Sequence, residues 1–157
     1  MSSENDAIVV TIDLMGNKDL PEVLAIEKES FISPWSEGMF VDELKVAHSQ
    51  CLVARLSHNN KSIIGGCIIF WIVADEAHLH NIAVKKEFHG QGLAHGFMNV
   101  MKEISRQAGV KAQTLEVRES NLEAIKLYRK CGFVVKGKRS LYYTDTHEDA
   151  LIMWADV

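Results

Sequence analysis

Cysteine, basic runs and long apolar stretches are all scarce in this chain. The three cysteines, Cys51, Cys67 and Cys131, are odd in number and widely spaced, which fits neither a disulfide framework nor a Cys-x-x-Cys metal site. We expect them to be small buried side chains in a reducing cytosol. The opening segment MSSENDAIVV has neither a basic region nor a long apolar stretch, so we expect no signal peptide, no membrane span and a cytoplasmic protein.

The charge balance is mildly acidic. The formal net charge is −4 and no basic stripe is visible, which argues against a nucleic-acid partner. Hydrophobic residues make up 47% and charged residues 24% of the chain, as in ordinary globular proteins. Because 157 residues can bury a sizeable core and no linker, internal repeat or low-complexity segment appears, we expect a single domain over 1–157, acting as a monomer or weak dimer.

Hydrophobic periodicity predicts a mixed α/β fold. Strand patterns occur at 7–15, 51–56, 63–74, 77–84, 113–117, 133–138 and 147–157. Helical patterns run from Asn17 or Asp19 to about Ser30, then to about Val46, from the glycine-rich segment to Ala108, and from Ser120 to Cys131. The paired glycines of IIGGCIIF suggest a β-bulge. We expect a mixed sheet of about six to seven strands, antiparallel at first and then with a parallel crossover, carrying helices on both faces.

The segment NIAVKKEFHGQGLAHG raises the question of a ligand. Gly90, Gly92 and Gly96 leave backbone amides uncovered just where a helical pattern begins, and such a helix N-terminus favours anions, phosphate above all. The spacing is not the Gly-x-Gly-x-x-Gly of dinucleotide-binding folds, and no Gly-Lys-Ser/Thr follows as in a P-loop. The segment therefore predicts a phosphate-bearing ligand of another kind, or a purely structural strand-to-helix turn.

The strand that follows carries an unexpected carboxylate. In TLEVR, Leu115 and Val117 point to one face, while Glu116 and Arg118 point to the other. A strand between two helical segments should be buried on both faces, so a carboxylate there needs a cleft or a partner. Glu116 is therefore either a functional group at a cleft or the ion-pair partner of Arg118.

The last helical pattern adds an amide and a phenol. SNLE reads as a capping box in which Ser120 caps the helix, and Asn121 and Tyr128 then fall on one face, two turns apart. Tyr128 is either a functional phenol or a core aromatic whose hydroxyl bonds to backbone.

Taken together, these segments resemble the GNAT superfamily of acetyl-CoA-dependent N-acetyltransferases. Within it they are similar to the RimI branch, which acetylates the terminal alanine of a small-subunit ribosomal protein. The resemblance covers nearly the whole chain and rests on SPWSEGMF (33–40), DEAHLHNIAV (75–84), GQGLAHG (90–96), LEVRESNLEAIKLYRKCGF (115–133), RSLYY (139–143) and EDALIM (148–153).

The resemblance implies a role for each group. It implies direct transfer within a ternary complex, with Glu116 as the base that takes the amine proton and Tyr128 as the acid at the departing thiolate. Strand amides would stabilise the oxyanion, and Asn121 would bind the pantetheine amides. The implied cofactor-binding residues are Ile82, Ala83, Val84, His89, Gly90, Gln91, Gly92, Leu93, Ala94, His95 and Asn121. The implied walls of the acceptor cleft, suited to a peptide N-terminus, are Phe31, Trp35, Tyr142 and Tyr143.

Some alternatives stay open at this point. The superfamily pattern Gln/Arg-x-x-Gly-x-Gly/Ala reads here HGQGLA, so His89 replaces the usual residue and predicts weaker side-chain support of the loop. His80, or less favourably Glu76, could act as the base. No familiar ligand spacing supports a metal site. Trp35 could instead anchor a loop on the core. The enzyme could acetylate a small amine or a lysine side chain, or the chain could be a non-catalytic acyl-CoA-binding module.

Overall fold

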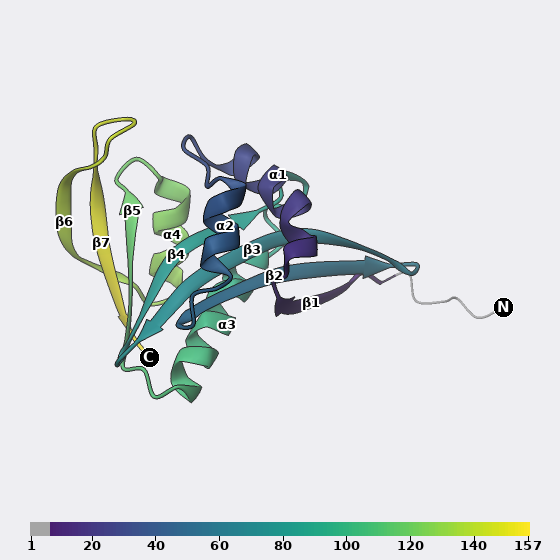
Figure 1. The fold of residues 1–157 in the computed structure, drawn as a ribbon. Coiled ribbons are helices and arrows are strands. Elements are labelled where there is room, and N and C mark those ends of the chain that lie inside the picture. Colours follow the sequence, from purple (N-terminus) through teal and green to yellow (C-terminus); the bar gives the residue numbers. More distant parts are fainter. Residues whose placement is uncertain (1–6) are drawn as a thin grey trace.

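A computed structural model describes residues 7–157. A seven-stranded sheet has the order β1-β2-β3-β4-β5-β7-β6 over these residues (Figure 1). The strands are β1 (Val9–Leu14), β2 (Ser49–His58), β3 (Lys61–Val73), β4 (Glu76–Val84), β5 (Ala112–Arg118), β6 (Val134–Tyr143) and β7 (Glu148–Asp156). The helices are α1 (Leu20–Ser30), α2 (Glu37–Glu43), α3 (Leu93–Gln107) and α4 (Leu122–Lys130), with 3-10 turns at Asn17–Asp19 and Lys86–Phe88.

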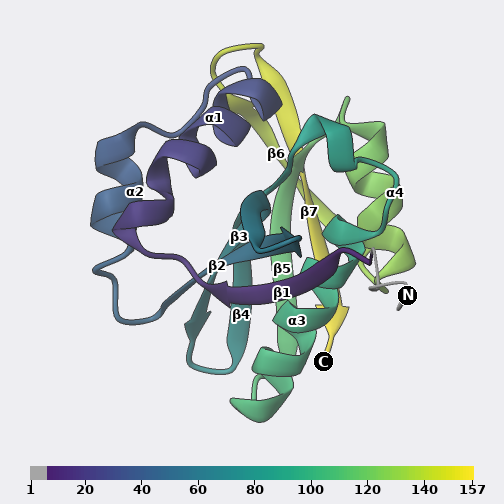
Figure 2. The same cartoon turned by 90° about the vertical axis from the view of Figure 1, so that its right-hand side faces the viewer.

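Helices cover both faces of the sheet, as the sequence predicts. Figure 2 shows α1 and α2 on one side and α3 and α4 on the other. One hydrophobic core lies under α3 and α4 and includes Phe97, Met101 and Leu115, while a second lies under α1 and α2 and includes Val23 and Phe40. Within residues 7–157, no helix is long and apolar enough to span a membrane. The first six residues of MSSENDAIVV, on which the expectation of no signal peptide partly rests, lie outside the described residues.

The predicted parallel pairing occurs between β4 and β5, and it is short. The two strands pair only from Glu76 to His78, against Ala112 to Thr114. β4 then continues to Val84, paired with β3, and β5 continues to Arg118, paired with β7. The sheet therefore splits between β4 and β5 beyond His78, and the backbone groups on the two inner edges have no strand partner there.

Two β-bulges shape the strands around this split. β3 skips Gly65 in its pairing with β2, which confirms the bulge predicted from the paired glycines. β4 skips His80 in its pairing with β3, and the side-chain alternation of β4 changes phase there. Before the bulge, Leu79 packs in the core under α3 and α4, whereas after it Asn81 and Ala83 face α1.

The start of α4 differs from the prediction. Asn121, and not Ser120, is the N-cap residue, because the Asn121 side-chain oxygen accepts a hydrogen bond from the Ala124 N–H at 3.3 Å. The predicted capping box of Ser120 and Glu123 is therefore wrong by one residue. Asn has a high preference for this position, so the sequence SN offered two adjacent caps and the backbone uses the second.

We expect Gly66→Ala to destabilise the fold. A Cβ at Gly66 would lie 2.6 Å from the backbone oxygen of Ala83 and 3.0 Å from the Phe97 ring, so β3 and β4 would have to shift. The expected loss is about 1–3 kcal/mol in the free energy of unfolding, as for other overpacked cores, measured by urea denaturation. Gly38→Ala in α2 is the control, because an added Cβ there would lie 3.9 Å from its nearest neighbouring atom. It should be neutral or stabilising by up to about 1 kcal/mol, and an equal loss in both variants would contradict the packing argument.

Candidate active site

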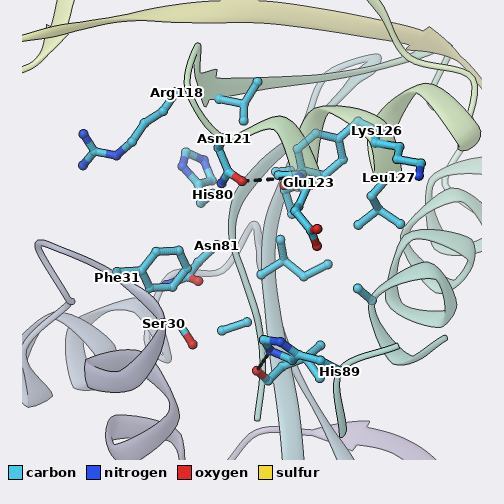
Figure 3. Close-up of a pocket in the computed structure, with 18 of the residues that line it drawn as sticks. Ser30, Phe31, His80, Asn81, His89, Arg118, Asn121, Glu123, Lys126 and Leu127 are labelled. Atoms are coloured by element: carbon cyan, nitrogen blue, oxygen red, sulfur yellow. Dashed lines mark hydrogen bonds between the residues drawn. The ribbon is translucent and has the colours of Figure 1, made fainter. Parts of the chain in front are cut away.

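A cleft of about 1210 Å³ follows the split between β4 and β5 (Figure 3). In Figure 3, Phe31 and Asn81 lie on the left, Lys126 and Leu127 of α4 lie on the right, and His89 lies below them, while His80 and Asn121 overlap in this view. The predicted site residues that line the cleft are Phe31, Trp35, Ile82, Ala83, Val84, His89, Gly90, Gly92, Leu93, Ala94, His95, Glu116, Asn121, Tyr128, Tyr142 and Tyr143. Gln91 is not among the lining residues, and its side-chain amide donates to the Glu87 carbonyl at 3.4 Å.

The inner edge of β4 offers backbone groups to the cleft. The Lys85 N–H donates to the Gly65 carbonyl of β3 at 2.8 Å. Because backbone direction alternates along a strand, Ala83 also turns toward β3, whereas Ile82 and Val84 direct their N–H and C=O groups into the split. These are groups with which an extended amide-containing ligand can pair as an additional strand.

The glycine-rich segment enters α3 with a left-handed backbone at two glycines. Gly90 and Gly92 have φ angles of +76° and +83°, and Gly92 is the N-cap residue of α3. A Cβ at either position would meet nothing within 4 Å, so the left-handed backbone, rather than lack of space, favours glycine there. The first amides of α3 point into the cleft mouth without a side-chain cap, which is the arrangement that binds phosphate.

His89 links this loop to the end of β4. Its ring Nε2 lies 2.8 Å from the carbonyl oxygen of Val84. A carbonyl can only accept, so the ring carries its proton on Nε2 and donates it. The imidazole therefore ties the loop to the end of β4.

Glu116 lies in the cleft, but its partner is not Arg118. One Glu116 oxygen is 2.5 Å from His78 Nε2, and the other is 3.5 Å from an Arg139 nitrogen. The hydrogen bond from His78 lowers the pKa of Glu116 in spite of partial burial, so the carboxylate stays ionised from mildly acidic pH upward. The alternative in which Glu116 pairs with Arg118 is wrong, because Arg118 binds Asp145 instead.

His80 occupies the bulge of β4. Its ring contacts the tilted rings of Trp71 and His78, with centroid distances of 4.3 and 4.4 Å, and its buried Nε2 has no hydrogen-bond partner within residues 7–157. Burial lowers the pKa of His80 to about 4. The ring is therefore neutral at physiological pH and a poorer proton acceptor than an unperturbed histidine.

Tyr128 approaches the cleft from α4. Its side chain is 6% exposed and its ring packs against Phe133 at 6.0 Å. Burial raises the pKa of Tyr128 above its ordinary value, so the phenol keeps its proton. Tyr128 also lines the cleft, so the phenol lies where it can donate to a ligand.

The aromatic walls have mixed surroundings. Phe31 and Tyr142 are 37% and 46% exposed. Trp35 packs against Phe40, with ring centroids 5.2 Å apart, which confirms that it anchors its loop on the core. It also lines the cleft, and its role in an acceptor wall stays a prediction. Its backbone N–H donates to Glu27 at 3.0 Å.

Sequence reasoning missed the polar supports of the site. The buried Glu27 carboxylate accepts two hydrogen bonds from the Asn81 amide, at 3.0 and 3.1 Å, and so joins α1 to β4. The contact between His78 and Glu116 also spans two elements. The one sequence signal for it was that His78 and Glu116 both sit on strands that form the parallel crossover.

Comparison with known proteins identifies the family. The model of the Acetyltransferase (GNAT) family matches residues 20–133. A ribosomal protein bS18-alanine N-acetyltransferase of Escherichia coli is 37% identical, covering 91% of this chain and 95% of that protein. A Bacillus subtilis relative, provisionally given the same name, is 39% identical, covering 89% and 91% of the two chains.

Solved structures agree. The crystal structure of the Escherichia coli ribosomal-protein-S18-alanine N-acetyltransferase superposes with a TM-score of 0.82 at 34% identity, covering 95% of this chain and 94% of the other. Ard1 from Thermoplasma volcanium superposes with a TM-score of 0.84 at 26% identity, covering 94% and 97%. The split sheet, the glycine-rich loop and these matches lead to one conclusion: the chain belongs to the GNAT family of acetyltransferases.

Proposed function

We propose that this protein is an N-alpha-acetyltransferase that moves an acetyl group from acetyl-CoA to the N-terminal amine of a protein. The N-terminal alanine of a ribosomal small-subunit protein is the proposed acceptor, because relatives that are 37% identical over most of the chain carry that activity in their names. We place the reaction in the cytoplasm, where ribosomal proteins are made. The reaction is direct transfer within a ternary complex of enzyme, acetyl-CoA and acceptor.

One observation carries the proposal: the two candidate catalytic groups reach the split from opposite faces of the sheet. Leu115 and Val117 pack under α3 and α4, so Glu116, between them in sequence, points to the α1 and α2 face. Tyr128 belongs to α4, on the other face. A carbonyl held between β4 and β5 would thus have the carboxylate on one side and the phenol on the other.

This arrangement suits attack by an amine. An α-amine has a pKa near 8 and is mostly protonated at neutral pH, so a proton must leave before or during attack. Glu116, directly or through a water, takes that proton as the new C–N bond forms. N–H groups of Ile82 and Val84 on the inner edge of β4 are candidates to stabilise the negative charge on the oxygen. The C–S bond breaks, and Tyr128 donates its proton to the departing sulfur.

The residues present fit acetyl-CoA. Its pyrophosphate would lie on the amides of the loop from Gly90 to His95, and its pantetheine arm would pair with the inner edge of β4. Asn121 uses its side-chain oxygen for the helix cap, so its NH₂ group would donate to a pantetheine carbonyl. The cofactor supplies an activated acyl group as a thioester.

We expect acetyl-CoA to stabilise the folded protein through this loop. At a hundredfold excess over the dissociation constant, the free energy of unfolding should rise by about 2.7 kcal/mol, seen as a higher melting temperature. Gly92→Val should abolish the rise, because valine is strained at φ +83° and covers the amides. Gly109→Val is the matched control: Gly109 has φ +74° at the other end of α3, so this variant should lose stability and keep the response. A shift with NAD or ATP but none with acetyl-CoA would contradict the assignment.

The acceptor preference should favour chain ends. A short peptide beginning with alanine should be acetylated faster than a peptide with a blocked N-terminus and free lysines, because the aromatic walls suit an extended peptide end. Mass spectrometry of both products at equal concentrations measures the preference. Equal rates would indicate that the acceptor is a lysine side chain or a small amine and not the terminal amine. The absence of turnover with either peptide would favour a non-catalytic acyl-CoA-binding module.

Glu116→Gln should slow the chemical step about a hundred- to ten-thousandfold and leave acetyl-CoA affinity unchanged. Because the pKa of Glu116 is lowered, the wild-type carboxylate is ionised well below neutral pH, so the acidic limb of the wild-type rate should reflect the amine. In the variant the rate should recover partly at high pH, where the amine is already neutral. A defect of the same size at every pH would indicate that His80, and not Glu116, is the base.

Tyr128→Phe keeps the ring and removes only the hydroxyl. Turnover should fall within the same range without recovery at high pH, because the missing proton belongs to the leaving group. Single-turnover kinetics with saturating acetyl-CoA separates the chemical step from binding. Near-normal turnover with slightly lower stability would make Tyr128 a core residue rather than the acid.

A further inference from the structure

The bulge of β4 places two consecutive polar side chains on the same face of the sheet. Asn81 reaches Glu27 of α1 through its side-chain amide, so it lies on the face that α1 and α2 cover. The His80 ring contacts Trp71, and the Trp71 indole donates to Glu43 of α2, so His80 lies on that face as well. Neighbouring residues of a regular strand point to opposite faces, and the extra residue of the bulge brings these two together.

Each of these side chains has one buried polar atom without a hydrogen-bond partner within residues 7–157. The two atoms are Nε2 of His80 and Oδ1 of Asn81. Asn81 is 7% exposed, and its amide nitrogen donates to Glu27, so its oxygen is directed away from that carboxylate. Unpaired buried polar atoms are costly, and native structures contain few of them. Because both residues line the cleft (Figure 3), two such atoms on adjacent residues indicate hydrogen bonds that a bound ligand completes.

Both atoms suit a ligand group that donates hydrogen bonds. The amide oxygen of Asn81 can only accept. Burial lowers the pKa of His80 to about 4, so its ring is neutral at physiological pH. In the tautomer that carries the proton on Nδ1, Nε2 has a free lone pair and accepts as well.

The bulge lies beside the proposed base. The rings of His80 and His78 are in contact, with centroids 4.4 Å apart, and His78 Nε2 is 2.5 Å from a Glu116 oxygen. Each carboxylate oxygen can accept two hydrogen bonds, so Glu116 keeps capacity for a further donor. Glu116, His80 and Asn81 thus offer three acceptors on one face of the sheet, one of them charged. Such a set suits an ammonium group, which has three N–H donors and a positive charge.

We propose that His80 and Asn81 bind the terminal amine of the acceptor beside Glu116. The proposal rests on the proposed function and names the residues that orient its nucleophile. In the ammonium form, the amine donates to all three acceptors. When Glu116 takes one proton, the hydrogen bonds to the bulge still hold the nitrogen and limit its movement next to the thioester carbon.

The test measures binding without chemistry. The enzyme is saturated with CoA, which has no acetyl group to transfer, and calorimetry gives the dissociation constants of two peptides. One begins with a free alanine, and the other is its des-amino analogue, in which a propionyl group replaces that alanine. The wild-type enzyme should bind the alanine peptide more tightly. Asn81→Ala should reduce this preference about tenfold, the scale of one hydrogen bond to a charged group, by weakening the binding of the alanine peptide alone.

His80→Phe is the second variant, and Thr114→Val is the matched control. His80→Phe keeps an aromatic ring against Trp71, removes Nε2 and leaves the pair of Asn81 and Glu27 intact, so it should also reduce the preference about tenfold. Thr114 lies on the same face of β5 as Glu116 and is 8% exposed, but it is not among the residues that line the cleft. Loss of its hydroxyl should leave the preference unchanged. Melting temperature and CoA affinity, measured for every variant, report whether the fold and the cofactor end are intact.

The outcomes separate the amine site from the proposed function. A preference that stays constant in Asn81→Ala and His80→Phe, or an equal loss of affinity for the two peptides, overturns the amine site and leaves the function standing. So does a wild-type enzyme that acetylates the alanine peptide but binds both peptides equally well. If Asn81→Ala does not fold because Glu27 loses its partner, the preference in His80→Phe decides. A wild-type enzyme that acetylates no free peptide amine overturns the proposed function, and the amine site with it.

Discussion

The site depends on the early separation of β4 and β5. Three paired residues hold the two strands together, and beyond them each strand stays in the sheet through its other neighbour. An unpaired backbone edge inside a protein would ordinarily be costly. Here the edge lines a cleft wide enough for water or a ligand, so its groups can be satisfied without closing the sheet. The split gives a ligand both a binding edge and a passage between the two faces.

In the proposed reaction, the two faces of the sheet have different roles. The α3 and α4 side provides the glycine-rich loop and Tyr128, which suit the cofactor and the leaving thiolate. The α1 and α2 side provides Glu116 and the aromatic walls, which suit the incoming amine. Two substrates that enter from opposite sides can be bound at the same time, and this is what direct transfer in a ternary complex needs. Charge follows the same division, because the ionised Glu116 is surrounded by His78 and Arg139, whereas Tyr128 lies in an apolar core.

The sequence predicts the features that depend on local pattern. The glycine-rich loop at the start of α3, the position of Glu116 on a central strand and the face of α4 that carries Asn121 and Tyr128 all follow from spacing within about ten residues. Features that depend on register do not. The local sequence suggested Arg118, two residues away, as the partner of Glu116. In the structure the partner is His78, 38 positions earlier. The pairing of Arg118 with Asp145 and the bulge at His80 likewise depend on how distant strands align. A single sequence does not encode that alignment in any local pattern.

The bulge at His80 determines to which face of the sheet each following side chain of β4 points. One extra residue lets Leu79 face the core under α3 while Asn81 reaches Glu27 on the opposite side, although both positions would share a face in a regular strand. The same extra residue decides which peptide groups turn toward β3 and which toward the cleft. A strand of identical composition without it would point the backbone of Ala83, rather than that of Ile82 and Val84, at the ligand, and would aim Asn81 into the apolar core. The chemistry of this edge is thus set by a count of residues as much as by their identity.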